Sequence, residues 1–156
     1  HLAEQVLDID GYNVLTTVET SIAGGVLLRG RDGCLRDIAG IHGSFRKVEE
    51  TLPALEYIEN YLRHCKVIRW RWILDQPVSN SGRLAAMIRQ RIAAGNFSAT
   101  VDVAIDPDAV LKKTPYIVAS SDSEILNHCD KWFDLAAAVI NTHIKQPWIV
   151  DLSPPK

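Results

Sequence analysis

The chain has few cysteines, little net charge and no long apolar run, and each of these excludes a class of protein. Its three cysteines, Cys34, Cys65 and Cys129, lie far apart and lack the spacing of metal ligands. An odd number of scattered cysteines makes a poor disulfide framework, so we predict reduced thiols in a cytoplasmic protein. No apolar run reaches the roughly 18 residues that span a bilayer, and no signal peptide is visible, so no membrane role is expected.

The formal net charge of −2 provides no overall basic field, so a nucleic-acid role would need a local basic patch. Hydrophobic residues make up 47% and charged residues 23% of the 156 residues, which is an ordinary globular composition. This length suits one domain with a real core, so we predict a single domain over 1–156. The chain begins at His1 without a methionine, and we expect it to be a fragment of a longer protein.

Strand-like and helix-like segments alternate along the whole sequence. The predicted strands cover 6–9, 66–75, 98–105, 116–120 and 132–133, with an edge strand in the tail from 147 onward. The predicted helices cover 13–23, 34–41, 47–63, 82–94, 123–129 and 134–144, with loops at 26–34 and 106–115. This alternation predicts a three-layer α/β/α fold with a mainly parallel central sheet of about five strands.

Three acids follow the carboxyl ends of predicted strands: Asp10, Asp75 and Asp122. Ligands of such sheets bind beyond the carboxyl ends of the strands, so these acids share one crevice if their strands are neighbours. Gathered carboxylates raise one another's pKa unless a cation joins them, and Mg²⁺ prefers oxygen ligands. Any one acid taken alone is more often a helix cap or turn former than a metal ligand, and Asn13 is expected to be the N-cap of the first helix.

Three segments resemble the NYN branch of the PIN-like nucleases. "DIDGYNVL" (8–15) resembles the first strand and turn of that superfamily, and "WILDQPVSNSG" (72–82) a middle strand that ends in Asp. "ASSDSEIL" (119–126) resembles its late acidic motif. The combination of "DGYNVLTTVE" (10–19), "RDGCLRDIAG" (31–40) and "DQPVSNSGRL" (75–84) also resembles an uncharacterised prokaryotic family of unknown function, in which this region tends to follow another small domain.

The resemblance implies a metal-dependent nuclease, expected to be an endoribonuclease acting on RNA with Mg²⁺ or Mn²⁺. Asp10 matches the first metal carboxylate and Asp122 the late one. Glu124 stands where the family usually has Asp, which keeps the charge but lengthens the side chain, so Glu124 is expected to assist catalysis through a water. The candidates for the family's remaining acid are Asp32, Asp37, Glu49 and Glu50. Asp32 and Asp37 are preferred among them, with Asp32 as the expected metal ligand.

Other residues are assigned by position around this predicted centre. The substrate is expected to contact Asn13, Arg31, Arg36, Arg83 and Ser121. Asp8 and Asp75 are expected to contact the metal ligands without binding the metal themselves. The alternatives without a functional role are that the arginines lie on a solvated helix face and that Asp122 is the N-cap of a helix.

A non-catalytic RNA- or protein-binding module of the same fold is the competing function. A phosphatase with Asp10 as nucleophile is ranked last, because "DIDG" lacks the Thr or Ser context expected to follow. Trp148 and the apolar tail suit a homodimer contact.

Overall fold

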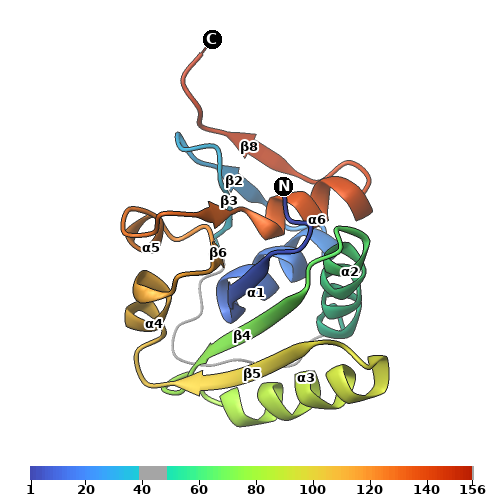
Figure 1. Cartoon of the computed structure of the whole chain (residues 1–156). Coiled ribbons are helices and arrows are strands. Elements are labelled where there is room, and N and C mark those ends of the chain that lie inside the picture. Colours follow the sequence, from blue (N-terminus) through green and yellow to red (C-terminus); the bar gives the residue numbers. More distant parts are fainter. Residues whose placement is uncertain (39–48, 156) are drawn as a thin grey trace.

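A five-stranded parallel sheet forms the centre of the protein (Figure 1). The computed structural model describes residues 1–38 and 49–155. The strands are β1 (Val6–Asp10), β4 (Arg69–Asp75), β5 (Ala99–Ala104), β6 (Ile117–Ala119) and β7 (Trp132–Phe133). They are arranged in the order β5-β4-β1-β6-β7, and every neighbouring pair is parallel. Both faces of such a sheet must be covered, since its strands carry apolar residues on both sides.

Helices cover the two faces unequally. The longer ones are α1 (Gly11–Ile22), α2 (Thr51–His64), α3 (Ser81–Gly95) and α6 (Leu135–His143). They bury the larger core, which includes the β4 side chains Trp70, Trp72 and Leu74. The short helices α4 (Pro107–Lys113) and α5 (Ser123–Leu126) close a smaller core on the opposite face around Ile73. These layers confirm the predicted three-layer α/β/α fold and its mainly parallel sheet.

Alternation along β1 places its two acids on the same face of the sheet. Leu7 and Ile9 belong to the larger core, so Asp8 and Asp10 point to the side covered by α4. Asp8 is 1% exposed and is paired in register with Arg71 of β4. The Arg71 guanidinium donates to both carboxylate oxygens, at 3.0 and 2.6 Å. Asp8 therefore joins two central strands through a bidentate ion pair.

Three short strands form a second sheet in the order β3-β2-β8. They are β2 (Leu27–Arg29), β3 (Leu35–Asp37) and β8 (Ile149–Asp151). The helix predicted over 34–41 is therefore wrong across 34–38, and residues 39–41 lie outside the described part. The predicted loop at 26–34 contains the strand β2. A turn at Gly30–Gly33 folds β3 back on β2, and this antiparallel pairing overrides the helical spacing of the apolar residues.

Other predictions are corrected at the level of single elements. The predicted connector at 106–115 contains α4, which Asp106 caps by accepting from the Ala109 amide at 3.0 Å. In α2, Leu55, Ile58 and Leu62 are buried, whereas Leu52 is 40% exposed. Residues 47 and 48 of that predicted helix lie outside the described part.

The predicted tail strand is confirmed as β8, although it joins the second sheet. Cys34, Cys65 and Cys129 are free, as predicted, with Cys34 fully buried and the other two partly buried. Within 1–38 and 49–155, no helix combines the length and hydropathy that crossing a membrane requires.

Candidate functional site

The sheet changes its winding direction between β1 and β6. The chain leaves β1 toward β4 on one side, whereas it leaves β6 toward β7 on the other. In an open α/β sheet, ligands bind in the crevice at the carboxyl ends of two such strands. Asp10 is the last residue of β1, and Ser120, Ser121 and Asp122 follow β6 directly. The predicted meeting of Asp10 and Asp122 at one rim of the sheet is therefore found.

A serine joins the two acids at this point. The Ser120 hydroxyl donates to Oδ2 of Asp10 at 2.8 Å, and its oxygen accepts from the Asp122 amide at 3.0 Å. The serine is 1% exposed, so this bridge is shielded from water. It fixes the orientation of the Asp10 carboxylate relative to the loop that follows β6.

Gly11 explains how α1 can begin immediately after Asp10. A Cβ at this position would lie 2.9 Å from the carbonyl oxygen of Ile73 and would collide with Leu74. The neighbouring strand β4 thus approaches too closely for any side chain. The Asp-Gly pair in "DIDG" is needed for the backbone to turn from strand to helix against β4.

Four carboxylates make up what we call the acidic cluster: Asp10, Asp75, Asp108 and Asp122. Burial is the largest cause of a pKa of about 7 for Asp10, against an ordinary value of 3.8; the Ser120 hydrogen bond opposes it. The negative charges of Asp108, Asp122 and Asp75 raise that pKa further. The pKa of Asp108 is also raised, first by burial and then by Asp122. The four carboxylates are therefore close enough to repel one another.

Asp75 is a second indication that a water or a ligand belongs at this edge of the sheet. Its Oδ1 atom is buried and has no hydrogen-bond partner within the described part of the chain. Burial raises the pKa of Asp75, and the charge of Asp106 raises it further. A buried carboxylate oxygen without a donor costs free energy, so it suits a site that a water or a cation completes.

The cluster offers the oxygen ligands that Mg²⁺ or Mn²⁺ prefers. Among residues 1–38 and 49–155, no three His, Cys, Asp or Glu side chains are placed to enclose an ion together. Mg²⁺ commonly keeps several waters and is held by one or two carboxylates, so the donor set fits such an open site. Asp10 and Asp122 are the pair that would hold the ion, with Asp75 beside them.

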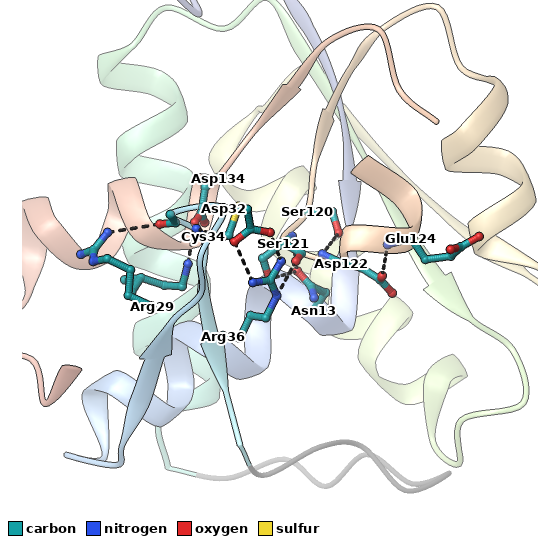
Figure 2. Close-up of polar contacts among 12 residues, drawn as sticks. Asn13, Arg29, Asp32, Cys34, Arg36, Ser120, Ser121, Asp122, Glu124 and Asp134 are labelled. Atoms are coloured by element: carbon teal, nitrogen blue, oxygen red, sulfur yellow. Dashed lines mark hydrogen bonds and ion pairs between the residues drawn. The ribbon is translucent and has the colours of Figure 1, made fainter. Parts of the chain in front are cut away.

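The loop that carries Asp122 is clamped from two sides (Figure 2). Oδ1 of Asn13 accepts from the Ser121 amide at 2.9 Å and from its hydroxyl at 3.1 Å. Arg36 donates from Nε to the Ser121 carbonyl at 2.8 Å. The sequence prediction that Asn13 is the N-cap is therefore wrong: Asn13 lies within α1 and holds the loop in place.

Asp32 lies in this clamp rather than in the acidic cluster. Its carboxylate receives both terminal nitrogens of Arg36, at 3.0 and 2.6 Å, and also accepts from the Cys34 amide (Figure 2). The Arg36 hydrogen bonds are the main cause of the lowered pKa of Asp32. The structure thus separates Asp32, the preferred third metal ligand, from Asp10 and places it behind Arg36.

A cavity of about 380 Å³ opens beside the acidic cluster. Asp37 contributes a wall of this cavity, and its Oδ2 accepts from Thr17 at 3.1 Å and from Thr16 at 3.4 Å. We call this space the threonine cavity. It is lined by Tyr12, Asn13, Thr16, Thr17, Arg36, Asp37, Ser121, Asp122 and Ser123.

The remaining predicted residues lie nearer the surface. Glu124 is 65% exposed and forms an ion pair with Lys112 at 3.0 Å, which lowers the pKa of the glutamate. Asp122 also accepts from the Glu124 amide at 2.9 Å, so its predicted capping role is real. Arg31 is exposed in the turn between β2 and β3, and Arg83 is exposed in the first turn of α3.

Asp108 is the member of the cluster that sequence reasoning missed. The segment "DPDAVLKK" (106–113) has Asp at an N-cap position and Pro at the first helical position, which together indicate a helix start. A helix beginning there, directly after β5, places Asp108 in its first turn at the carboxyl rim of the sheet. Because a loop was predicted over 106–115, the position of Asp108 at this rim was not predicted.

Fold and site together define a doubly wound α/β protein with an acidic crevice at the switch point of its sheet. The chain belongs to the family described as Domain of unknown function (DUF5616), whose model matches residues 1–138. It is similar to an uncharacterized protein of Methanocaldococcus jannaschii, with 33% identity over 118 residues. The match covers 76% of this chain and 56% of that relative, so the chain spans about half the relative's length. No solved structure matches the chain.

Proposed function

We propose that this chain is a metal-dependent nuclease that hydrolyses phosphodiester bonds of RNA with Mg²⁺ or Mn²⁺. The observation that carries the proposal is the acidic cluster at the switch point, where burial and three neighbouring charges raise the pKa of Asp10 to about 7. Such a carboxylate gains from a cation beside it, because the cation removes the repulsion. The resemblance of "DIDGYNVL" and "ASSDSEIL" to the PIN-like nucleases supports the same reading.

Each residue around the crevice has a distinct part in this proposal. Asp10 and Asp122 hold the cation, and the Ser120 hydroxyl orients the Asp10 carboxylate through its 2.8 Å hydrogen bond. When bound, Mg²⁺ or Mn²⁺ supplies positive charge that stabilises the developing charge on phosphate and activates a water. Asp75 has a buried oxygen with no partner among the described residues, which suits a water held at the rim.

The loop clamp contributes by fixing Asp122 relative to Asp10. Asn13 and Arg36 hold the three polar atoms of Ser121, so the next residue cannot move independently of α1 and β3. Rigid placement of charged groups matters because a ligand misplaced by about 1 Å can cost roughly 100-fold in rate. Asn13, Arg36 and Asp32 are thus positioning residues in this proposal.

The test is cleavage of a fluorescently labelled single-stranded RNA with and without Mn²⁺. We expect cleavage that requires the ion and falls by roughly 100-fold in Asp10→Asn and in Asp122→Asn. Asp130→Asn is the matched control, because Asp130 is an exposed acid outside the cluster and should keep full activity. Cleavage that survives chelation, or that Asp10→Asn retains, contradicts the proposal.

A non-catalytic RNA-binding module is the second candidate. Two observations favour it: the described residues contain no three-acid group around one point, and Asp122 already caps α5. In this case the chain binds the labelled RNA but leaves it intact at every Mn²⁺ concentration. Binding without cleavage therefore selects this alternative over the nuclease.

A further inference from the structure

The ammonium group of Lys112 lies against the acidic cluster. Lys112 follows Asp108 by four residues on α4, so the two side chains lie on the same face of that helix. Its Nζ atom donates to Oε1 of Glu124, on α5, at 3.0 Å. The amide of Glu124 in turn donates to Asp122, which caps α5. Lys112 therefore bridges the two short helices that bring Asp108 and Asp122 to the cluster.

Three neighbouring carboxylates act on this one ammonium group. The hydrogen bond to Glu124 is the largest cause of the raised pKa of Lys112, and the charges of Asp108 and Asp122 raise it further. In return, the charge of Lys112 opposes the rise in the pKa of Asp108 that burial and Asp122 cause. Lys112 is thus a positive group within electrostatic reach of the carboxylates at the crevice.

Packing holds Lys112 in this position, unlike the next residue of the chain. The Lys112 side chain is 25% exposed, so most of its stem is covered and much of its rotamer freedom is already lost. Lys113 is exposed and lines a separate cavity with Arg71 and Tyr116. A ligand that binds Lys112 therefore costs less conformational entropy than one that binds a mobile surface lysine.

Lys112 also has donors to offer a ligand. An ammonium group has three donors, and Glu124 is the one hydrogen-bond partner that residues 1–38 and 49–155 give it. Two donors of Lys112 are therefore left for a ligand. Arg36, by contrast, already directs its guanidinium to Asp32 and to the Ser121 carbonyl.

A phosphodiester in the crevice needs such a positive group. The cluster has four carboxylates, so a single divalent ion leaves negative charge that repels a phosphate. A lysine beside the ion lowers this repulsion, and lysine is a common point-charge ligand of phosphate. We propose that Lys112 binds the phosphate group that the cation at Asp10 and Asp122 also contacts. The inference rests on the proposed function for the position of that cation.

The first test measures RNA binding without cleavage. In the Asp10→Asn background with Mn²⁺, fluorescence anisotropy follows two labelled single-stranded RNAs, one of adenylates and one of cytidylates. Adding Lys112→Met should weaken both by the same factor, about tenfold at low salt, because a phosphate contact carries no sequence information. The slope of log affinity against log salt concentration should become shallower by about 0.7, the share of one phosphate contact in a single strand.

Lys113→Met is the matched control, because it removes the same charge one residue away at an exposed position of α4. It should change RNA affinity by less than about twofold and leave the salt slope unchanged. Lys112→Arg keeps the positive charge and should bind both RNAs within about threefold of the parent. Lys112→Gln gives the reading if Lys112→Met lowers the melting temperature.

The second test uses Mn²⁺ alone and the chain with Asp10 intact. In isothermal titration calorimetry, Lys112→Met should bind Mn²⁺ about threefold more tightly than wild type, because a positive charge beside the cation is removed. Lys113→Met should bind Mn²⁺ like wild type. Opposite shifts, tighter for Mn²⁺ and weaker for RNA, are not expected of an ion pair that only supports the fold.

The inference is overturned if Lys112→Met and Lys113→Met affect RNA binding equally, if only one of the two RNAs is weakened, or if the parent binds neither. Weaker RNA binding without tighter Mn²⁺ binding also overturns it, since Lys112 would then lie away from the cation. Failure of the proposed function looks different: the wild type leaves RNA uncut in Mn²⁺ while Lys112→Met still weakens RNA binding. Conversely, Mn²⁺-dependent cleavage together with unchanged RNA binding by Lys112→Met supports the nuclease and removes the role of Lys112.

Discussion

Replacing Asp10 by Asn should stabilise the fold at alkaline pH, although it removes a proposed metal ligand. Burial raises the pKa of Asp10 from 3.8 to about 7, so the folded chain prefers the protonated form. Because the pKa is higher in the folded chain, protonation of Asp10 contributes to the free energy of unfolding. This contribution is complete below about pH 4 and is lost as the pH rises through about 7. Above pH 7 the wild type keeps a repelled, partly buried charge that asparagine does not have. Asparagine also retains an oxygen that can accept the Ser120 hydroxyl.

The size of the effect follows from the same two pKa values. Each pKa unit corresponds to about 1.4 kcal/mol, so the difference between 3.8 and about 7 sets an upper limit of about 4 kcal/mol. Asp10 is only partly buried, and solvent screening reduces this to roughly 2 kcal/mol. For a chain of 156 residues, that amounts to a rise in melting temperature of about 4–8 °C.

The assay is thermal unfolding followed by circular dichroism at pH 4, 6 and 8 in a chelating buffer. The gain of Asp10→Asn over wild type should be near zero at pH 4 and largest at pH 8. Titrating groups outside the acidic cluster contribute equally to both proteins, so the difference reports Asp10 together with its repulsion of Asp75, Asp108 and Asp122. Asp130→Asn, at an exposed acid, should show no such trend. Added Mn²⁺ should stabilise the wild type at pH 8 by mass action and stabilise Asp10→Asn much less.

The electrostatic argument is refuted if Asp10→Asn melts below wild type at pH 8, or if its gain does not grow with pH. Either result means that Asp10 is not held in a repulsive, desolvated position. The case for a cation at this rim would then lose its physical basis.

Three further predictions concern acids elsewhere in the fold. Asp8→Asn should lower the free energy of unfolding in urea by about 2–4 kcal/mol without changing Mn²⁺-dependent cleavage, because it breaks the buried pair with Arg71. Glu124→Gln should leave the melting temperature and the cleavage rate unchanged, because Glu124 is exposed and paired only with Lys112; a large loss of cleavage would restore its predicted catalytic role. Burial raises the pKa of Glu19 to about 7, so Glu19→Gln should stabilise the fold by about 1–2 kcal/mol at pH 8 but not at pH 4, as thermal unfolding at both pH values would show.

Much of the main sheet could be predicted because its strands carry strong local signals. "YIVA" (116–119) is an unbroken apolar run, and Trp70 and Trp72 alternate with arginines along β4. Both tryptophans are buried in the larger core. Strand existence and order along the chain follow from such patterns, since a buried parallel strand needs apolar residues on both faces.

The second sheet could not be predicted, because its strands are three residues long and depend on distant partners. Leu35 lies in a stretch with helical apolar spacing, yet it pairs with β2 across a glycine turn. That pairing is supported by β8, more than 100 residues further along the chain. A segment this short has too little local preference to resist such pairing, so tertiary contacts decided its conformation.

The site divides in the same way between local and long-range information. The sequence by itself determined that Asp10, Asp75 and Asp122 end or follow strands, since Asp is favoured where an apolar run stops at a turn or cap. Only the tertiary structure decided that β1 lies between β4 and β6, which brings these three acids and Asp108 to one rim. The tertiary structure also places Asp32 outside the cluster, where its carboxylate pairs with the guanidinium of Arg36. Strand ends are encoded locally, whereas the neighbours of a strand depend on the packing of the whole chain.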